Sequence, residues 1–549
     1  MRQGISFASG VMACVAAAAL LAGCGGGGGG GGGGGIPLLP IAPGSDGQVA
    51  DGGGAGLPVQ PIAPGAGQVT LSGTATYEII PNPSGALVYA GAASKPVRGA
   101  LVDVIDAASS IQLATATTDD NGAYAVAVPA NTIVAVRVRA QLARSGQGAT
   151  WDVTVRDNTR SGALYSMQTS AFSSGAVAAT VRDIHAPSGW GGSSYTGERV
   201  AGPFAILDTV YAAMQKVTSV APATAFPVLR VFWSVNNAPA SGSIAAGQIG
   251  TTFFVSRSSG REIYVLGKED SDTDEYDAPV IAHEWGHYYQ SAMSRDDSTG
   301  GEHGQNDRLD RRLAFSEGWG NAWSGIALGR RNYVDSVGPQ QSLPGANIDL
   351  GAGAATTPGW YREPSIQSIF WNLNQQVGFK PIHDTLTSSQ FRGGAAVTSI
   401  HPFSAAFNAV APGSAAALAA LLSGQGISAA ANDPFGTAET NNGGISGTIP
   451  MYKPATANGT VTQACVSSDA GPGNKLGSFS YVRFTAPANG SYQLQVNGAA
   501  GTNPDFDLFR GGLITRTSNT VSLSAGEYVL AVTDLNNSNT CFNVSIQPQ

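Results

Sequence analysis

His283-Glu284-Trp285-Gly286-His287 is the stretch of sequence around which the expected fold of the central region is organised. On an α-helix, residues four positions apart lie on the same face, one turn from each other. The two histidines can therefore grip one metal ion while Glu284 projects beside them. A catalytic zinc ion needs three protein ligands and an open fourth position, so the motif predicts a zinc site that still lacks one ligand. The alternative is a buried helix whose two histidines are only hydrogen-bonded.

The residues around this motif favour the helix that it requires. Asp277 is suited to cap the N-terminus, and Pro279 lies in the first turn, where its missing N–H group costs nothing. Gly286 inside a helix costs about 1 kcal/mol relative to alanine. Its presence indicates that a neighbouring element approaches the helix closely at this point.

A candidate for the third ligand lies about 30 residues further on, in the stretch 314–321, which reads AFSEGWGN. On the helix expected from about 312 to 328, Glu317 and Asn321 share one face and large aromatic residues occupy the other. A carboxylate among large apolar residues is costly to bury unpaired, and a cation removes that cost. Glu302 and His303, in the polar loop between the two helices, are rival third ligands.

The combined pattern, His283-Glu284-x-x-His287 followed by Ser316-Glu317-Gly318, resembles the gluzincin metallopeptidases, whereas the metzincin continuation is absent. By this resemblance His283, His287 and Glu317 are zinc ligands and Glu284 is the catalytic base. The family often has an acidic group four residues after the glutamate ligand, where it orients a histidine. Asn321 stands at that position, so we expect this supporting contact to be weaker or differently made.

The resemblance also implies a mechanism. Zinc makes hydroxide available at neutral pH, and Glu284 takes the proton of the attacking water and delivers it to the leaving amine. A further donor should stabilise the oxyanion. Tyr361 and Arg362, directly before a helix expected at 364–376, are the candidates, with His383 behind them. The alternative is that each is an ordinary structural residue.

A strand is expected at 262–266, ahead of the motif. We predict that it forms the edge of a sheet and pairs with an extended peptide substrate, because strand addition gives affinity through backbone hydrogen bonds.

The acidic run from Asp270 to Asp277 has enough carboxylates to hold calcium. It lacks the glycine at position six and the glutamate at position twelve of an EF-hand loop. A solvated loop is therefore the preferred interpretation, and Ca²⁺ is kept as a second candidate cation beside Zn²⁺.

The first 24 residues have the features of an export signal. Met1-Arg2-Gln3 is a short basic start, and Val11 to Leu21 is an apolar run too short to span a bilayer. The run ends in Leu21-Ala22-Gly23-Cys24, which resembles the bacterial lipoprotein signal with its lipobox. The resemblance implies a lipid anchor at Cys24 and, since Gly25 follows, an outer-membrane destination. The alternative is an ordinary cleaved signal peptide and secretion.

Residues 25–67 are predicted to be a flexible tether, because a glycine run followed by Pro/Gly-rich sequence cannot bury enough apolar surface to become ordered. Between 68 and 185, alternating apolar residues separated by turns predict short strands. The phrases Pro96–Val104 and Thr118–Tyr124 resemble carboxypeptidase-regulatory-like domains, which are transthyretin-like β-sandwiches.

From 195 to 450 the apolar period becomes helical. Strands expected at 229–233 and 262–266 precede helices near 312–328, 364–376 and 405–422, which predicts an α+β domain. Beyond a Gly-rich linker, residues 451–549 return to short strands. The phrases Phe484–Tyr492 and Asp505–Phe509 resemble the bacterial pre-peptidase C-terminal domain, a β-sandwich commonly attached to secreted peptidases.

Two cysteines, Cys465 and Cys541, remain outside the predicted signal and anchor. In an exported protein such a pair within one small unit predicts a disulfide, worth roughly 4 kcal/mol in the chain-entropy model.

The chain has 549 residues and a net charge of −8 with scattered basic residues, so it should fold as several units and is not expected to bind nucleic acid. The sequence therefore predicts a multidomain protein with an N-terminal β-sandwich, a central α+β zincin-like catalytic domain and a C-terminal β-sandwich. We expect an exported, lipid-anchored zinc peptidase that acts on peptides or proteins as a monomer. The alternative is a surface adhesion or glycan-binding protein with a structural or degenerate zinc site.

Overall fold

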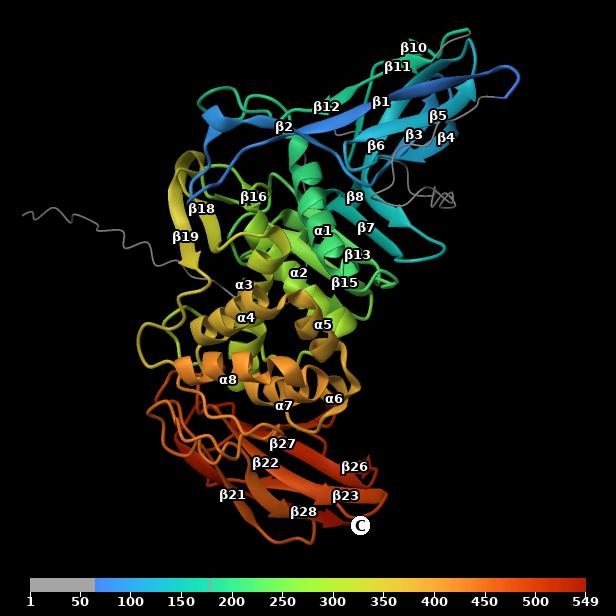
Figure 1. The fold of residues 1–549 in the computed structure, drawn as a ribbon. Coiled ribbons are helices and arrows are strands. Elements are labelled where there is room, and N and C mark those ends of the chain that lie inside the picture. Colours follow the sequence, from blue (N-terminus) through green and yellow to red (C-terminus); the bar gives the residue numbers. More distant parts are fainter. Residues whose placement is uncertain (1–64, 177–178) are drawn as a thin grey trace, which may run out of the picture.

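The computed structural model describes residues 65–176 and 179–549. The predicted signal, the lipidation at Cys24 and most of the tether at 25–67 lie outside these residues. Figure 1 shows three regions stacked along the molecule: a β-rich N-terminal region, a central region that contains the α-helices of the described residues, and a C-terminal β-region. The chain is thus a mixed α and β protein of several regions.

The first sheet of the N-terminal region is built around β1. Its alternating burial follows from the sequence, as in β5, where Tyr124, Val126 and Val128 are buried and the alanines between them are partly exposed. The sheet consists of β1 (Gln68–Ile79), β2 (Ala93–Pro96), β5 (Ala123–Pro129), β11 (Thr180–Val181) and β12 (Ile184–Ala186).

The second sheet has ten strands and continues into the central region. Its main order is β14 (Phe253–Arg257), β15 (Gly260–Val265), β13 (Leu229–Trp233), β7 (Trp151–Asp157), β6 (Ile133–Arg144), β3 (Ala100–Asp106) and β4 (Gln112–Thr117). The short strands β8 (Ala163–Leu164), β9 (Ser166–Gln168) and β10 (Phe172–Ser173) pair with β7 or β6.

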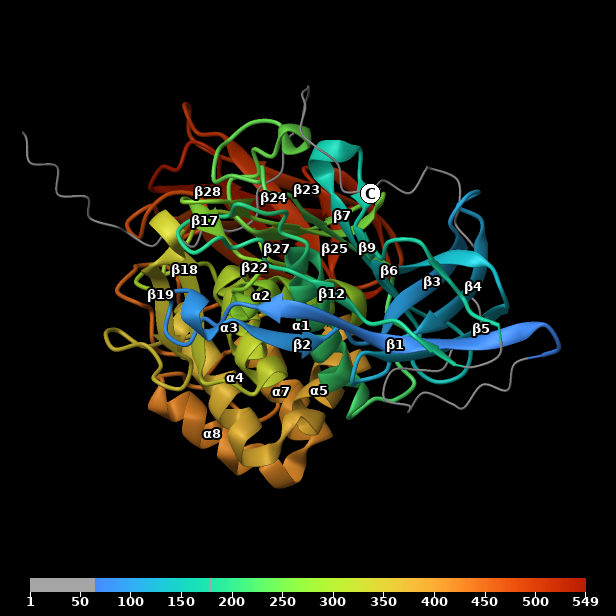
Figure 2. The same cartoon turned by 90° about the horizontal axis from the view of Figure 1, so that it is seen from above.

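The pairing of β7 with β13 joins the N-terminal and central regions. The two strands run parallel, from Leu229 opposite Val153 to Phe232 opposite Arg156. The sheet therefore crosses the boundary expected between residues 185 and 195, and the two regions also share one hydrophobic core. Figure 2, seen from above, shows the N-terminal strands extending sideways from the helices.

The edge of this sheet is β14 and not the strand predicted from the sequence. β15 lies between β14 and β13 and pairs with both, so it has no free edge for a peptide. The prediction that residues 262–266 form the edge strand is wrong, because a hairpin closed by Arg257 and Gly260 places another strand outside them.

Three helices form the centre of the molecule. α2 (Ala278–Met293) packs on α3 (Arg311–Leu328), and α3 packs on α4 (Glu363–Val377). α3 is buried on nearly every side, and its small residues make this possible: a Cβ on Gly318 would lie 2.5 Å from Ile366 Cβ on α4. The helices expected at 312–328 and 364–376 are confirmed.

The remaining helices cover this centre: α1 (Ala201–Thr218), α5 (Phe379–Thr387), α6 (Ser389–Gly393), α7 (Ile400–Val410) and α8 (Ala415–Gly424). The single helix expected at 405–422 is wrong. The chain breaks at Pro412, which lacks the N–H group that a continuous helix needs, and resumes at an angle of 116°. Among the described residues no single helix has the length and apolar character to cross a membrane, although this bent pair passes such a test on length and composition.

A small four-stranded sheet lies beside the N-terminus of α2. It consists of β16 (Gly267–Lys268), β17 (Asp272–Thr273), β18 (Asn332–Val337) and β19 (Leu343–Asp349). β18 follows α3 directly, so this sheet connects the two helices that carry the predicted ligands.

The C-terminal region is a sandwich of two sheets with a core of its own. One sheet has the order β20 (Lys453–Thr456), β22 (Phe479–Ala486), β27 (Gly526–Asp534), β24 (Pro504–Phe509) and β25 (Leu513–Arg516). The other has the order β21 (Thr462–Val466), β28 (Thr540–Pro548), β23 (Gly490–Asn497) and β26 (Thr520–Leu523).

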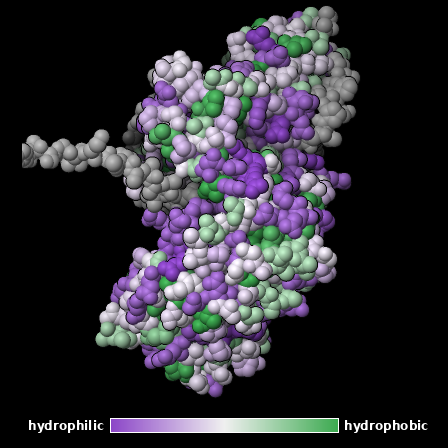
Figure 3. Space-filling view, turned by 60° about the vertical axis from the view of Figure 1, so that its left-hand side comes forward, coloured by the Kyte–Doolittle hydropathy of each residue, from purple (hydrophilic) through white to green (hydrophobic). Residues whose placement is uncertain are grey.

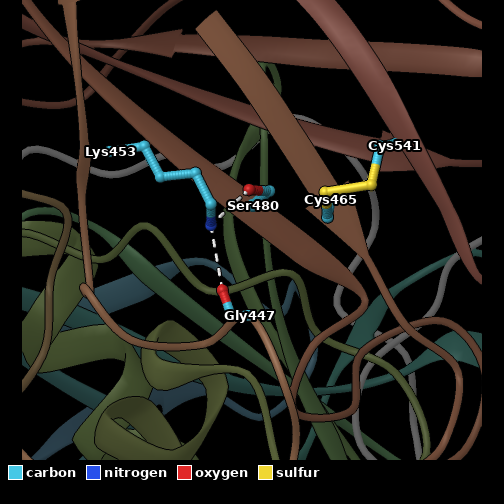
Figure 4. The surroundings of a disulfide bond; sticks show 5 residues. All are labelled: Gly447, Lys453, Cys465, Ser480 and Cys541. Atoms are coloured by element: carbon cyan, nitrogen blue, oxygen red, sulfur yellow. Dashed lines mark hydrogen bonds between the residues drawn. A yellow bond between two sulfur atoms is a disulfide. The ribbon is translucent and has the colours of Figure 1, made fainter.

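The predicted disulfide between Cys465 and Cys541 is confirmed. The two cysteines are directly opposite each other on β21 and β28, so the bond ties an edge strand to its neighbour. Figure 4 shows that Lys453, on the opposing sheet, donates to Gly447 and Ser480.

On the face of the molecule in Figure 3, hydrophobic residues are scattered among hydrophilic ones.

Candidate metal centre

The two histidines of the motif and Glu317 converge between α2 and α3. Nε2 of His283 lies 3.0 Å from Nε2 of His287, and one Glu317 oxygen lies 3.1 Å from the first nitrogen and 3.4 Å from the second. All three side chains are at most 8% exposed. The structure therefore brings together the three residues expected to be ligands.

Asn321 determines which nitrogen of His283 carries the proton. Its side-chain N–H groups donate to Glu363 Oε1 at 2.5 Å and to Gln367 Oε1 at 3.0 Å, so its Oδ1 faces His283. His283 Nδ1 must then donate to this oxygen, at 2.8 Å. The lone pair of Nε2 consequently points towards Glu317 and His287, which is the form of imidazole that binds a metal ion.

His287 is held in the same way from the other side. Its Nδ1 lies 3.3 Å from Gln290 Oε1 and 3.2 Å from Ser316 Oγ, and both oxygens can accept. Ser316 in turn donates to Asp296 Oδ2 at 3.1 Å. The second histidine therefore also has polar partners that leave its Nε2 directed into the centre.

Glu284 lies beside the ligands and is anchored to the edge strand of the large sheet. One of its oxygens accepts the backbone N–H of Phe254, on β14, at 2.7 Å. Burial raises the pKa of the Glu284 carboxyl above its ordinary value, and the nearby imidazoles of His283 and His287 offset only part of that effect. Such a carboxylate is a stronger base than an exposed one.

Electrostatics of the centre favour a cation. Burial alone would raise the pKa of Glu317, but the imidazoles of His303 and His287 outweigh it and hold that pKa well below the usual range. Conversely, burial lowers the pKa of His287, but the charge of Glu317 raises it to about 10. The buried carboxylate of Glu317 is therefore stabilised by positive charge beside it, which a divalent cation can supply.

His303, the rival third ligand, also reaches this centre. Its Nε2 lies 3.3 Å from the same Glu317 oxygen, while its Nδ1 donates to Glu363 Oε2 at 2.9 Å. His303 is buried, although it belongs to the loop between α2 and α3, and it faces Glu317 as a neighbour outside the three converging residues. Glu302 is exposed in that loop.

Glu363 is a residue that the sequence analysis missed. It is the first residue of α4, it is fully buried, and its carboxylate accepts hydrogen bonds from His303, Asn321 and Gln305. The sequence signal was weak: an acidic residue at a helix N-terminus is common, because it interacts favourably with the helix dipole.

The two candidate oxyanion donors are held elsewhere by their hydrogen bonds. The Tyr361 hydroxyl donates to Asn441 Oδ1 at 3.1 Å, and Arg362 donates to Thr357 and to the Gln305 carbonyl. Among the described residues, the hydrogen-bond partners of both side chains do not include Glu284, His283, His287 or Glu317. His383 bonds to the Tyr289 hydroxyl at 2.9 Å. The geometry therefore gives these residues no support as oxyanion donors.

A second group of acidic residues lies at the β17–β18 pair. Carboxylate oxygens of Asp272, Asp274 and Asp335 lie within 4.8 Å of one another. The expectation of a solvated loop is wrong for this segment, since Asp274 and Asp277 are 2% and 0% exposed. Asp277 directly precedes α2, but its side chain does not cap the helix; its carboxylate accepts from Asn82 and Ser336 instead.

Two large cavities open near the candidate centre. One of about 820 Å³ is lined by Phe254, Gln290 and Asp296 and also by Arg392. The other, of about 790 Å³, is lined by His303 and by residues of the C-terminal sandwich such as Lys475. In the first cavity, Phe254 bonds to Glu284 and Gln290 bonds to His287. In the second cavity, His303 contacts Glu317.

No protein-family model and no curated protein matches this chain. Among solved structures, the pre-peptidase C-terminal domain of a collagenase from Bacillus anthracis aligns at 11% identity over 17% of this chain and 93% of its own, with a TM-score of 0.14. The lysozyme inhibitor PliG from Salmonella Typhimurium aligns at 17% identity over 18% and 99%, with a TM-score of 0.13.

A 9R-lipoxygenase from Cyanothece PCC8801 aligns at 12% identity over 32% of this chain and 26% of its own, with a TM-score of 0.14. The collagenase domain is of the kind that the C-terminal sequence resembles. At TM-scores this low, however, none of these likenesses assigns a function to the chain.

Proposed function

We propose that the chain is a zinc-dependent peptidase whose central region is zincin-like. The observation that carries this proposal is the convergence of two imidazole nitrogens and one carboxylate oxygen, all buried, with a second carboxylate beside them. Two histidines and one glutamate are a donor set that catalytic zinc sites use, and they leave one coordination position for water or substrate.

The residues present fit a zinc ion. Both imidazoles have Nδ1 beside a hydrogen-bond acceptor, Asn321 for His283 and Gln290 or Ser316 for His287, which leaves the two Nε2 atoms for the metal. When bound, zinc supplies Lewis acidity, which brings the pKa of a water molecule to about 7 and polarises a carbonyl group.

Glu284 is the general base of the proposed reaction. Its raised pKa suits it to accept the proton of the attacking water and to deliver that proton to the leaving amine. The backbone N–H of Phe254 fixes one carboxylate oxygen, so the other can face the water. The base is thereby held against the strand on which the substrate is proposed to lie.

β14 is the proposed substrate strand. It lies at one end of the ten-stranded sheet, so its outer backbone groups, apart from the Phe254 N–H that bonds to Glu284, can pair with an extended peptide. Phe254 belongs both to this strand and to the lining of the 820 Å³ cavity, which would receive substrate side chains. We also propose that a lipid at Cys24 anchors the protein to the outer membrane, where it would act on peptides or proteins.

Substitution Glu284→Gln tests the proposal. The variant should keep its zinc, because Glu284 is not among the converging ligands, and should lose at least about 100-fold in peptide hydrolysis. Metal analysis and cleavage of a mixed peptide library, with and without a zinc chelator, measure the two effects.

Glu439→Gln is the matched control, since Glu439 is also a buried carboxylate and bonds to His401 away from the centre. It should leave hydrolysis unchanged. Full turnover by the Glu284 variant would exclude Glu284 as the base. A wild-type protein that holds zinc but cleaves no peptide would favour the adhesion or glycan-binding alternative.

A further inference from the structure

The two arms of one hydrogen-bond network end at two of the three proposed ligands. On the first arm, Glu363 accepts from Asn321, and Asn321 accepts from His283. On the second arm, Glu363 accepts from His303, whose other ring nitrogen faces Glu317 at 3.3 Å. One carboxylate on α4 therefore stands behind ligands on both α2 and α3.

We propose that Glu363 is the positioning residue of the metal centre, and that through Asn321 and His303 it fixes His283 and Glu317 in the geometry that binds zinc. This inference rests on the proposed function and adds to it a residue that no sequence motif marks. The gluzincin family often has an acidic group at the position of Asn321; here an acidic group comes from another helix and acts through the amide of Asn321.

The chemistry of Glu363 explains why a carboxylate is required at this position. Both of its oxygens are used only as acceptors: Oε2 takes the His303 N–H, and Oε1 takes N–H groups of Asn321 and Gln305. An amide in its place would put an N–H group against one of these donors, at a site with no exposure to water.

Such a conflict would change which ring nitrogen of His283 carries the proton. If Asn321 turns its amide over to avoid the new donor, its N–H group faces His283 Nδ1, and that nitrogen must become an acceptor. The proton then moves to Nε2, which can no longer bind a metal ion. If Asn321 keeps its orientation, the new amide opposes His303 and the second arm is lost instead.

The test is the zinc affinity of the full exported chain, measured by competition with a fluorescent chelator. Glu363→Gln should weaken zinc binding by about 10- to 100-fold, as is usual when a partner of a metal ligand is lost. Glu439→Gln, at a buried glutamate that bonds to a histidine away from the centre, should leave the affinity unchanged.

An exchange of the two side chains separates positioning from simple loss of stability. Combined Asn321→Asp and Glu363→Gln substitution keeps an acceptor for His283 and a hydrogen bond between positions 321 and 363, with donor and acceptor reversed. The double variant should therefore recover most of the affinity that Glu363→Gln loses. In cobalt-substituted protein, the visible absorption should shift in Glu363→Gln and return in the double variant.

Asn321→Ala removes the first arm without altering Glu363 and should cost about tenfold in zinc affinity. Unchanged affinity in both Glu363→Gln and Asn321→Ala overturns the proposal, as does an equal loss in Glu439→Gln. A wild type that binds zinc without hydrolysing peptides contradicts the proposed function alone, because the affinity comparison still reports on Glu363.

Discussion

At the scale of single residues, two glycines allow α2 and α3 to meet. A Cβ on Gly286 would lie 3.1 Å from the Cα of Gly320, so α2 and α3 touch backbone to backbone at this point. A Cβ on Gly320 would lie 2.8 Å from Cε1 of His283. The close approach predicted from Gly286 in the sequence is confirmed, and the element that approaches is the helix that carries Glu317.

Gly320→Ala should displace the His283 ring from its position against Glu317. We expect zinc affinity to fall sharply and the free energy of unfolding to decrease by about 1–3 kcal/mol, as for overpacking of a close-packed core. Urea unfolding of the metal-free protein and zinc titration measure the two effects separately.

Gly424→Ala is the control, because a Cβ at Gly424, the last residue of α8, would meet no atom within 4 Å. It should leave zinc binding intact and change stability by less than about 1 kcal/mol, in the favourable direction. Wild-type zinc affinity in Gly320→Ala would show that the His283 ring is free to move.

At the scale of elements, several acidic residues lie in β17 and in the turn between β17 and α2. Burial, together with the charge of Asp277, raises the pKa of Asp272 to about 7. Burial also raises the pKa of Asp277 to about 6, although hydrogen bonds from Asn82 and Ser336 offset part of the effect. These acids are therefore protonated in the folded protein at a pH where they would be ionised in the unfolded chain.

The stability of the metal-free protein should consequently depend on pH through Asp272 and Asp277. Both folded-state pKa values lie above the value of about 3.9 for an unfolded aspartate. Their stabilising effect is complete below about pH 4 and is lost as the pH rises through 6 to 7, with a slope of at most about 1.4 kcal/mol per pH unit for each group. Denaturant unfolding in EDTA between pH 4.5 and 7.5 measures this decline.

Asp272→Asn removes one titrating group, and it also removes the charge that raises the pKa values of the neighbouring Asp274 and Asp335. The difference in unfolding free energy between variant and wild type should grow in favour of the variant as the pH rises. Calcium, kept in the sequence analysis as a second candidate cation, should remove the wild-type decline if it binds here, because a cation replaces the protons. A difference that stays constant with pH contradicts the raised pKa of Asp272.

The sequence predicted those parts of the site that depend on spacing within one helix. His283 and His287 share a face of α2, and Glu317 and Asn321 share a face of α3, because residues four apart must do so. Glu363 was missed because it comes from a third helix, and nothing in the sequence gives the register between α3 and α4.

The errors in the fold have equally local causes. The strand at 253–257 was overlooked, although the turn Ser258-Ser259-Gly260 between two apolar runs is a hairpin signal, and this misplaced the sheet edge. The shared sheet was not foreseen because β7 and β13 are paired across the 71 intervening residues 158–228, which contain α1.

At the scale of the whole molecule, the C-terminal sandwich contacts the N-terminus of α3. The guanidinium groups of Arg311 and Arg312 lie 4.1 Å and 5.4 Å from the ring centroid of Tyr481, on β22. The Tyr481 hydroxyl donates at 2.6 Å to Asp310, which also caps α3 and pairs with Arg312. The sandwich therefore supports the helix that bears Glu317.

Tyr481→Phe should lower the free energy of unfolding by about 1.5–3 kcal/mol, because it removes a hydrogen bond to a buried charged group. Tyr492→Phe, which removes a hydroxyl bonded to the Ala488 carbonyl within the sandwich, should cost about 0.5–1.5 kcal/mol. Urea unfolding measures both losses of free energy. Equal losses in the two variants would show that the hydrogen bond to Asp310 stabilises the protein no more than one to a backbone carbonyl.

The pairing of β7 with β13 also bears on how such a protein can change over generations. A gene rearrangement that replaced the first region with an unrelated module would leave the outer backbone groups of β13 without partners, and the resulting chain would tend to aggregate. We therefore expect residues 65 to 450 to be inherited together as one unit. Exchange of modules is expected to be tolerated only where the incoming piece supplies a strand that matches positions 153–156.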